Sequence, residues 1–133
     1  MNRISQHLKE GTLGELLVVL RFLQYDIQAA PPLKDSGNDL IAVRGDDFRS
    51  VQVKTTTTDR FDCRGLPEKY HLLALVQLDK IDPFHLDNCK IFLLSKGDVK
   101  QGSYAATRLT EYDLNQGRID TLFGECRSAA CSG

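Results

Sequence analysis

The sequence predicts an α/β fold in which a mixed central β-sheet is flanked by helices. Three observations support this prediction. Apolar residues recur at helical spacing near the start of the chain. Two apolar runs separated by a short polar turn follow, as in a β-hairpin. Two more strand-length apolar runs and a short helical segment complete an order that mixes helices and strands.

The size and composition of the chain fit a single domain. It has 133 residues, 41% of them hydrophobic and 26% charged, which is typical of a globular protein. We assign residues 1–123 to this domain and interpret residues 124–133 as a flexible tail, because they are small and polar. The formal net charge of -1 gives no global basic field, so any binding of nucleic acid must depend on local patches.

Several classes of protein are excluded or disfavoured by absent motifs. No segment reads as a signal peptide or a transmembrane helix, so we expect a cytoplasmic protein without a membrane partner. The three histidines are too widely separated to suggest a metal triad, and no Gly-rich phosphate loop is present. The four cysteines have no Cys-x-x-Cys spacing, and we interpret them as free thiols: Cys63, Cys89, Cys126 and Cys131.

The first predicted element is a largely buried helix over residues 5–24. Its apolar residues recur every three or four positions: Leu13, Leu16, Leu17, Leu20 and Leu23, widened by Val18, Val19 and Phe22. Glu15 lies on the same side as Val19 and Phe22, which makes it a candidate ligand. The alternative is that Glu15 lies at the edge of the stripe and complements the helix macrodipole. Gly11 and Gly14 indicate close approach of another backbone.

The middle of the chain is predicted to form the sheet. Residues 27–30 are a short strand ended by two prolines, and residues 34–38 are a polar turn. A hairpin with strands at residues 40–43 and 48–55 follows, and forms the centre of the sheet.

The rest of the chain alternates loops with short elements. We expect a loop at 59–67, a helical turn at 67–70, strands at 72–78 and 90–95, and a connector at 97–103. Residues 104–108 form either a short edge strand or none, and a helix over 109–116 ends at Gly117.

Polar residues at one end of the hairpin are the main functional lead. A turn centred between Asp46 and Asp47 would place Asp39 opposite Lys54, while Gln52 shares a face with Lys54. Burying an amide-like group without a partner costs about 2 to 7 kcal/mol, so these groups should bind something. The alternative is a structural ion pair of Asp39 with Lys54, capped by Gln52.

These residues resemble the motif of the PD-(D/E)xK nuclease superfamily. Glu15 lies in the first helix, Asp39 opens the second strand after a Gly-Asn turn, and Gln52-Val53-Lys54 lie in the third strand. The resemblance spans roughly residues 11–94 and is closest to small members such as archaeal Holliday junction resolvases. It implies a restriction-endonuclease-like three-layer core. Asn38 precedes the first acid in place of Pro, and Gln52 replaces the usual second acid, as in a homing-endonuclease subgroup that uses Gln-x-Lys.

The resemblance also implies a metal-dependent endonuclease that hydrolyses phosphodiester bonds of DNA, of restriction, resolvase or homing type. Asp39, the side-chain oxygen of Gln52, the carbonyl of Val53 and Glu15 would hold Mg²⁺, with Mn²⁺ as an alternative. Lys54 would orient the attacking water or stabilise transition-state charge, which makes Glu15, Asp39, Gln52 and Lys54 the catalytic set.

Two further expectations concern partners. Cutting both strands of branched or sequence-specific DNA requires two copies of a one-site domain, so we expect a homodimer or higher homo-oligomer. Gln52 removes one negative charge from the metal site. The alternative function is therefore a catalytically inactive nuclease-fold protein that acts as a nucleic-acid-binding or regulatory module.

Overall fold

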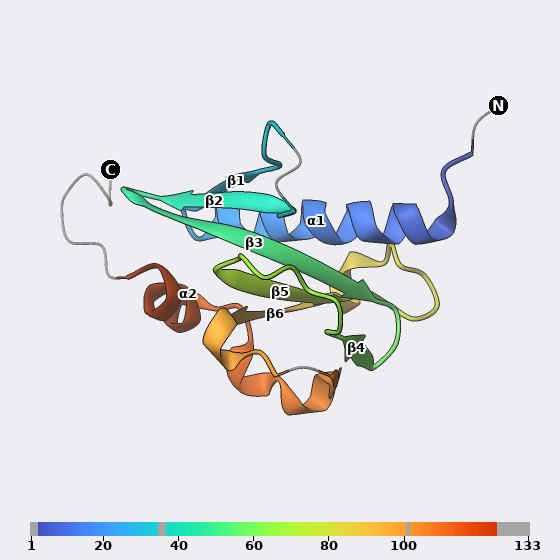
Figure 1. The fold of residues 1–133 in the computed structure, drawn as a ribbon. Coiled ribbons are helices and arrows are strands. Elements are labelled where there is room, and N and C mark those ends of the chain that lie inside the picture. The colour runs from blue at the N-terminus through green and yellow to red at the C-terminus, as the bar shows by residue number, and fades with distance from the viewer. Residues whose placement is uncertain (1–2, 35–36, 101, 125–133) are drawn as a thin grey trace.

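The computed structural model describes residues 3–34, 37–100 and 102–124, and a five-stranded sheet crosses its centre (Figure 1). The strand order is β1-β2-β3-β5-β6. The strands are β1 (Gln28–Ala30), β2 (Leu40–Arg44), β3 (Asp47–Thr56), β5 (Leu72–Gln77) and β6 (Lys90–Ser95). Strands β3 and β5 are parallel, and the other neighbouring pairs are antiparallel. The sheet is therefore mixed, as predicted.

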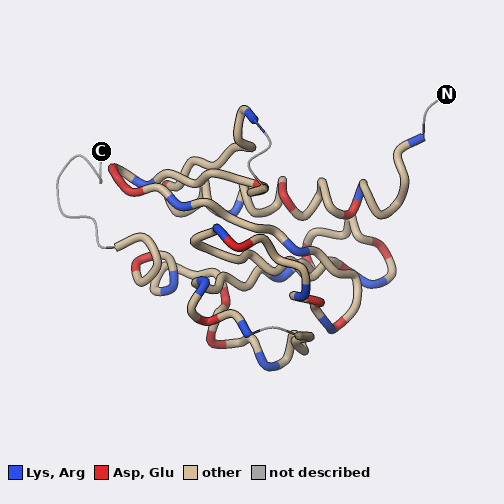
Figure 2. Tube along the Cα trace, in the orientation of Figure 1, with Lys and Arg blue, Asp and Glu red and all other residues tan. Residues whose placement is uncertain are grey.

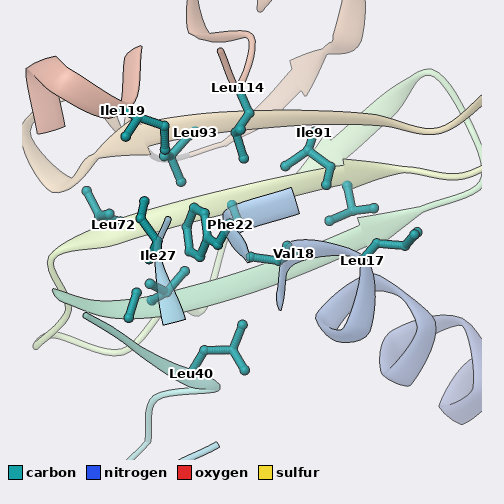
Figure 3. Close-up of a cluster of buried hydrophobic side chains, with 14 of the residues drawn as sticks. Leu17, Val18, Phe22, Ile27, Leu40, Leu72, Ile91, Leu93, Leu114 and Ile119 are labelled. Carbon is teal, nitrogen blue, oxygen red and sulfur yellow. The ribbon is translucent and has the colours of Figure 1, made fainter. Parts of the chain in front are cut away.

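Two helices share one apolar core with the sheet. They are α1 (Gln6–Gln24) and α2 (Gln116–Phe123). Phe22 of α1 meets Phe123 of α2 edge to face, with ring centroids 5.9 Å apart. Figure 3 shows Val18 and Phe22 of α1 among side chains of the strands, with Ile119 of α2 close to Leu93.

A second apolar cluster contains residues of a two-stranded ribbon. Strand β4 (Arg60–Asp62) pairs antiparallel with β7 (Ser103–Ala105). Alternate residues of β5 divide between the two clusters, so the ribbon and the helices cover opposite faces of the sheet. Short 3₁₀ turns complete the fold: Leu86–Asn88, Lys96–Asp98, Ala106–Arg108 and Thr110–Tyr112. The result is a three-layer arrangement.

The ribbon corrects one prediction and decides another. The predicted loop 59–67 contains strand β4, because Phe61 is buried as an anchor of the second cluster while its two neighbours stay exposed. The short edge strand that was one of two possibilities near residue 104 is formed as β7.

Two predicted helical elements are wrong. No helical turn forms at residues 67–70. The helix predicted at 109–116 begins instead at Gln116, so that Gly117 lies inside α2. The side chain of Asn115 accepts a hydrogen bond from the Arg118 N–H and caps this helix. Just before it, the Leu114 N–H bonds to the Ile91 carbonyl beside β6, which keeps the chain extended there.

The predicted burial of α1 is correct for one side of the helix only. Leu17, Val18 and Phe22 are buried, but Leu16, Leu20 and Leu23 are exposed: the helix is apolar on most sides and the sheet covers one of them. The remaining two residues of the predicted stripe, at positions 13 and 19, are half-buried.

Other expectations concern thiols and membranes. Cys63 and Cys89 are free thiols, as predicted, whereas Cys126, Cys131 and the rest of the tail beyond Gly124 lie outside the described residues. Within the described part of the chain, no helix combines the length and apolarity needed to cross a bilayer.

Candidate active site

The turn of the β2–β3 hairpin sets the register of the site. Arg44 pairs with Asp47, so Gly45 and Asp46 form a two-residue loop. Gly45 has φ +59°, and glycine with positive φ at the first central position is the signature of a type II′ turn. The predicted turn between Asp46 and Asp47 is therefore wrong by one residue.

The corrected register changes the neighbour of Asp39. Leu40 pairs with Val51, and continuing this pairing by one residue places Asp39 beside Gln52 instead of Lys54. The shift moves each partner by two positions, and side chains alternate with a period of two. Each side chain therefore stays on its predicted face of the sheet, and the polar residues still lie at the predicted end of the hairpin.

Asp39 is fixed by the backbone of β3. Its N–H donates to the Val51 carbonyl (3.1 Å), and its carboxylate Oδ2 accepts a hydrogen bond from the Val53 N–H (2.8 Å). The side chain thus takes the place of a strand partner just before β2 begins. Because the N–H and carbonyl of a strand residue point to the same edge, the Val53 carbonyl faces the edge where Asp39 lies.

Four of the five proposed site residues line one surface pocket. Glu15, Asp39, Val53 and Lys54 surround a pocket of about 230 Å³, together with His7, Glu10, Gly11 and Thr55. Burial raises the pKa of Glu15 above its usual value, and the neighbouring Asp39 carboxylate raises it further. The two carboxyl groups are therefore close enough to repel each other, which is a reason to bind a cation between them.

Gly14 explains how α1 brings Glu15 to this pocket. A Cβ at Gly14 would lie 1.9 Å from the Thr55 Oγ1 of β3, so only glycine allows the helix to pack this closely. The prediction of another backbone close to Gly14 is wrong in its partner, because the close contact is with the Thr55 side chain. At Gly11 it is wrong, since a Cβ there would meet nothing within 4 Å.

Gln52 lies beside the pocket but does not line it. Its side chain is buried, and Nε2 donates to the Gly37 carbonyl and to Asn38 Oδ1. Because a carbonyl only accepts, the NH₂ end of the amide must face Gly37, and Oε1 points the other way. The oxygen is therefore the end of the amide that can serve a ligand.

Lys54 contributes positive charge at the pocket without a fixed acidic partner. The ion pairs among the described residues include neither Lys54 nor Asp39, so the purely structural pair considered from the sequence is not formed. Burial raises the pKa of the Cys63 thiol to about 11, and Lys54 opposes this rise. Lys54 thus lines the pocket and also lies close enough to the segment after β4 to act on its charge.

One larger pocket elsewhere has its most strongly hydrogen-bonded carboxylate committed to its own loop. This pocket, of about 540 Å³, is lined by the end of β5 and by Asp79, Asp87 and Lys90. Hydrogen bonds from the Asp82 N–H, the Asn88 amide and the Ile81 N–H lower the pKa of Asp79. This carboxylate is already used to hold its own loop, so we place the candidate site in the smaller pocket.

Two residues of the pocket were missed in the sequence. His7 and Glu10 line it from α1, eight and five positions before Glu15. His7 is two helical turns from Glu15, a spacing that places both on one side of the helix and could have identified it. The family motif begins at Glu15, so the motif alone does not extend the site toward the start of α1.

Comparisons with known proteins support the fold. No family model matches the chain, and no curated protein matches it significantly. Among solved structures, the chain is similar to a bacterial homing endonuclease, I-Ssp6803I, with a TM-score of 0.64 and 15% sequence identity. The match covers 90% of this chain and 93% of the endonuclease chain. The predicted fold class is thereby confirmed: a mixed sheet flanked by helices, similar to a homing endonuclease structure.

Proposed function

We propose that this protein is a metal-dependent endonuclease that hydrolyses phosphodiester bonds of DNA. The observation that carries the proposal is the meeting of Glu15, Asp39 and Lys54 at one pocket, with Asp39 anchored to the Val53 N–H. Two acids and one cation from three different segments meet there. The likeness to a homing endonuclease structure adds the expectation of DNA as substrate.

The donor set fits a hard divalent cation. The carboxylates of Glu15 and Asp39, the Val53 carbonyl and the Gln52 Oε1 are all oxygen ligands, which Mg²⁺ and Mn²⁺ prefer. Burial, and to a lesser degree the Asp39 carboxylate, raise the pKa of Glu15, and a bound cation would offset both effects by stabilising the ionised carboxylate. When bound, the metal would supply Lewis-acid activation of water and neutralise charge on the phosphate.

The chain's own residues have distinct roles in this proposal. Asp39 holds its carboxylate rigidly, because Oδ2 is hydrogen-bonded to β3 and the second oxygen is left for the ligand. Glu15 supplies the other negative charge from α1. Lys54 donates a hydrogen bond to the attacking water or to a phosphate oxygen, where negative charge increases in the transition state.

Nicking of supercoiled plasmid DNA in Mg²⁺ or Mn²⁺ tests the proposal. Lys54→Ala should lower the rate by about 10²- to 10³-fold, as for loss of one transition-state donor. Lys69→Ala is the matched control, because Lys69 is an exposed lysine outside the pocket, and it should leave the rate unchanged. Equal rates for both variants would reject the role of Lys54.

A second candidate function is DNA binding without cleavage. It is favoured by Gln52, which is neutral and engages Gly37 and Asn38 with its NH₂ end. In that case the folded protein would bind DNA, but the unmutated protein would not nick plasmid DNA in either Mg²⁺ or Mn²⁺, whatever its concentration.

A further inference from the structure

The outer face of α1 carries a stripe of exposed leucines. Leu8, Leu16, Leu20 and Leu23 are between 49% and 60% exposed, although large apolar side chains are usually buried. The last three lie at spacings of four and three residues, so they share one side of the helix, opposite Leu17, Val18 and Phe22. We call Leu8, Leu16, Leu20 and Leu23 the outer stripe. Apolar stripes of this kind mark interaction sites.

The rest of this chain cannot cover the outer stripe. The longest segment outside the described residues is 125–133, with the sequence Glu-Cys-Arg-Ser-Ala-Ala-Cys-Ser-Gly. It contains no large apolar side chain that could fill the spaces between leucines. This segment is therefore not the occupant that the leucines favour.

We propose that the outer stripe is the interface of a homodimer, in which α1 packs antiparallel against α1 of a second copy. The charges of the helix favour this occupant and this direction. Lys9 and Glu15 border the stripe with opposite charges, Glu15 lying seven positions after Leu8, and Figure 2 shows most of the helix uncharged. Nucleic acid is thereby disfavoured as the partner.

Lys9 also distinguishes the two directions of packing. A parallel pair would place Lys9 beside its own copy. In an antiparallel pair with the two-fold axis at Leu16, the two Lys9 side chains lie about 21 Å apart, at a rise of 1.5 Å per residue. This separation is about two and a half Debye lengths at physiological salt, so their repulsion is screened. Each Lys9 then lies over Leu23 of the other copy, where its methylene stem can pack.

The stripe is self-complementary in this arrangement. Leu16 meets its own copy at the axis, and Leu20 lies against the small Thr12 of the partner, as expected of an isologous interface. The stripe spans about 22 Å from Leu8 to Leu23, which is one helix face and a small interface. We therefore expect a dimer of micromolar affinity. The inference holds whether or not the candidate site cleaves DNA.

Sedimentation velocity of the full chain over about 1 to 100 µM tests the proposal. The parent should shift from monomer to dimer across this range. Leu16→Glu should weaken the dimer at least about tenfold, because two carboxylates would meet at the axis. Phe48→Glu is the matched control. Phe48 and Leu23 are both 59% exposed, but Phe48 lies on the opposite face of the sheet, and its variant should dimerise like the parent.

The direction of packing has its own test. Leu23→Glu should weaken the dimer less than Leu16→Glu, because the new carboxylate would meet Lys9 of the other copy. Unchanged circular dichroism would show that these exposed positions leave the fold intact. A parent that stays monomeric throughout, or a Leu16→Glu variant that dimerises like the parent, overturns the proposal. Equal loss in the two leucine variants overturns the antiparallel register.

Discussion

Replacing Gly14 by alanine should destabilise the protein, although the same change stabilises most helices. Alanine is favoured over glycine inside a helix by about 1 kcal/mol. Here, however, the new Cβ would lie 1.9 Å from the Thr55 Oγ1 and 3.1 Å from the Thr55 Cβ and Cγ2. Rotating the hydroxyl relieves only part of this conflict, so α1 must move away from β3. Overpacking of this kind costs about 1 to 3 kcal/mol, and we expect the upper end. The net loss is then about 2 kcal/mol.

Thr55→Ala provides the background in which the sign should reverse. It removes the Oγ1 that would lie 1.9 Å from the new Cβ, together with the Cγ2 at 3.1 Å. Only the Thr55 Cβ remains at 3.1 Å, a tight contact that small shifts relieve. Gly14→Ala should then be neutral or stabilising, so that urea unfolding of the four proteins gives a coupling energy of about 2 to 3 kcal/mol. The same destabilisation in both backgrounds would refute the steric argument. Because Glu15 follows Gly14, the single variant should also bind Mg²⁺ more weakly than the double variant.

Two other predictions concern the charges of the site. The pKa of Glu15 is raised in the folded chain, so the folded chain holds more protons than the unfolded chain between the ordinary value of 4.5 and this raised pKa. Stability should therefore fall as pH rises through this window and stay lower above it. Between about pH 4 and pH 7, the thermal stability of the metal-free Glu15→Gln variant should fall less than that of the metal-free parent. Parallel curves of stability against pH for parent and variant would contradict this role of Glu15. Gln52→Glu replaces the NH₂ that donates to Gly37 and Asn38 by a carboxylate oxygen, so it should cost about 1 to 3 kcal/mol without metal. The added charge should at the same time tighten Mg²⁺ binding, measured by calorimetry; weaker binding would show that position 52 is not a ligand.

The location of the site could be predicted because it depends on periodicity more than on register. The predicted register gives Asp39 the wrong partner but the correct end of the hairpin and the correct neighbouring strand. An error of two positions preserves the face of every side chain in a strand. The signal that would have fixed the register was present in the sequence as Gly45-Asp46, since glycine at the first loop position is typical of a type II′ turn.

The C-terminal helix was misplaced because two start signals compete. Thr110 followed by acidic residues resembles a helix N-terminus, but the segment after it contributes Leu114 to the edge of β6. This tertiary contact is invisible in local sequence. Asn115 is then free to cap the helix that follows, and its side chain accepts the Arg118 N–H. Strand β4 was missed for a similar reason, because a three-residue strand with one buried phenylalanine has no measurable period.

The apolar pattern of α1 alone could not say which leucines are buried, since leucines lie on nearly every side of the helix. Gly14 resolves the ambiguity. The glycine marks the closest approach to β3, and the buried residues Leu17, Val18 and Phe22 follow it at three, four and eight positions, along one side. Leu16, Leu20 and Leu23 fall outside that spacing, and the sheet leaves them exposed. One side of α1 therefore brings Glu15 to the site, while the other carries the outer stripe that we propose a second copy covers.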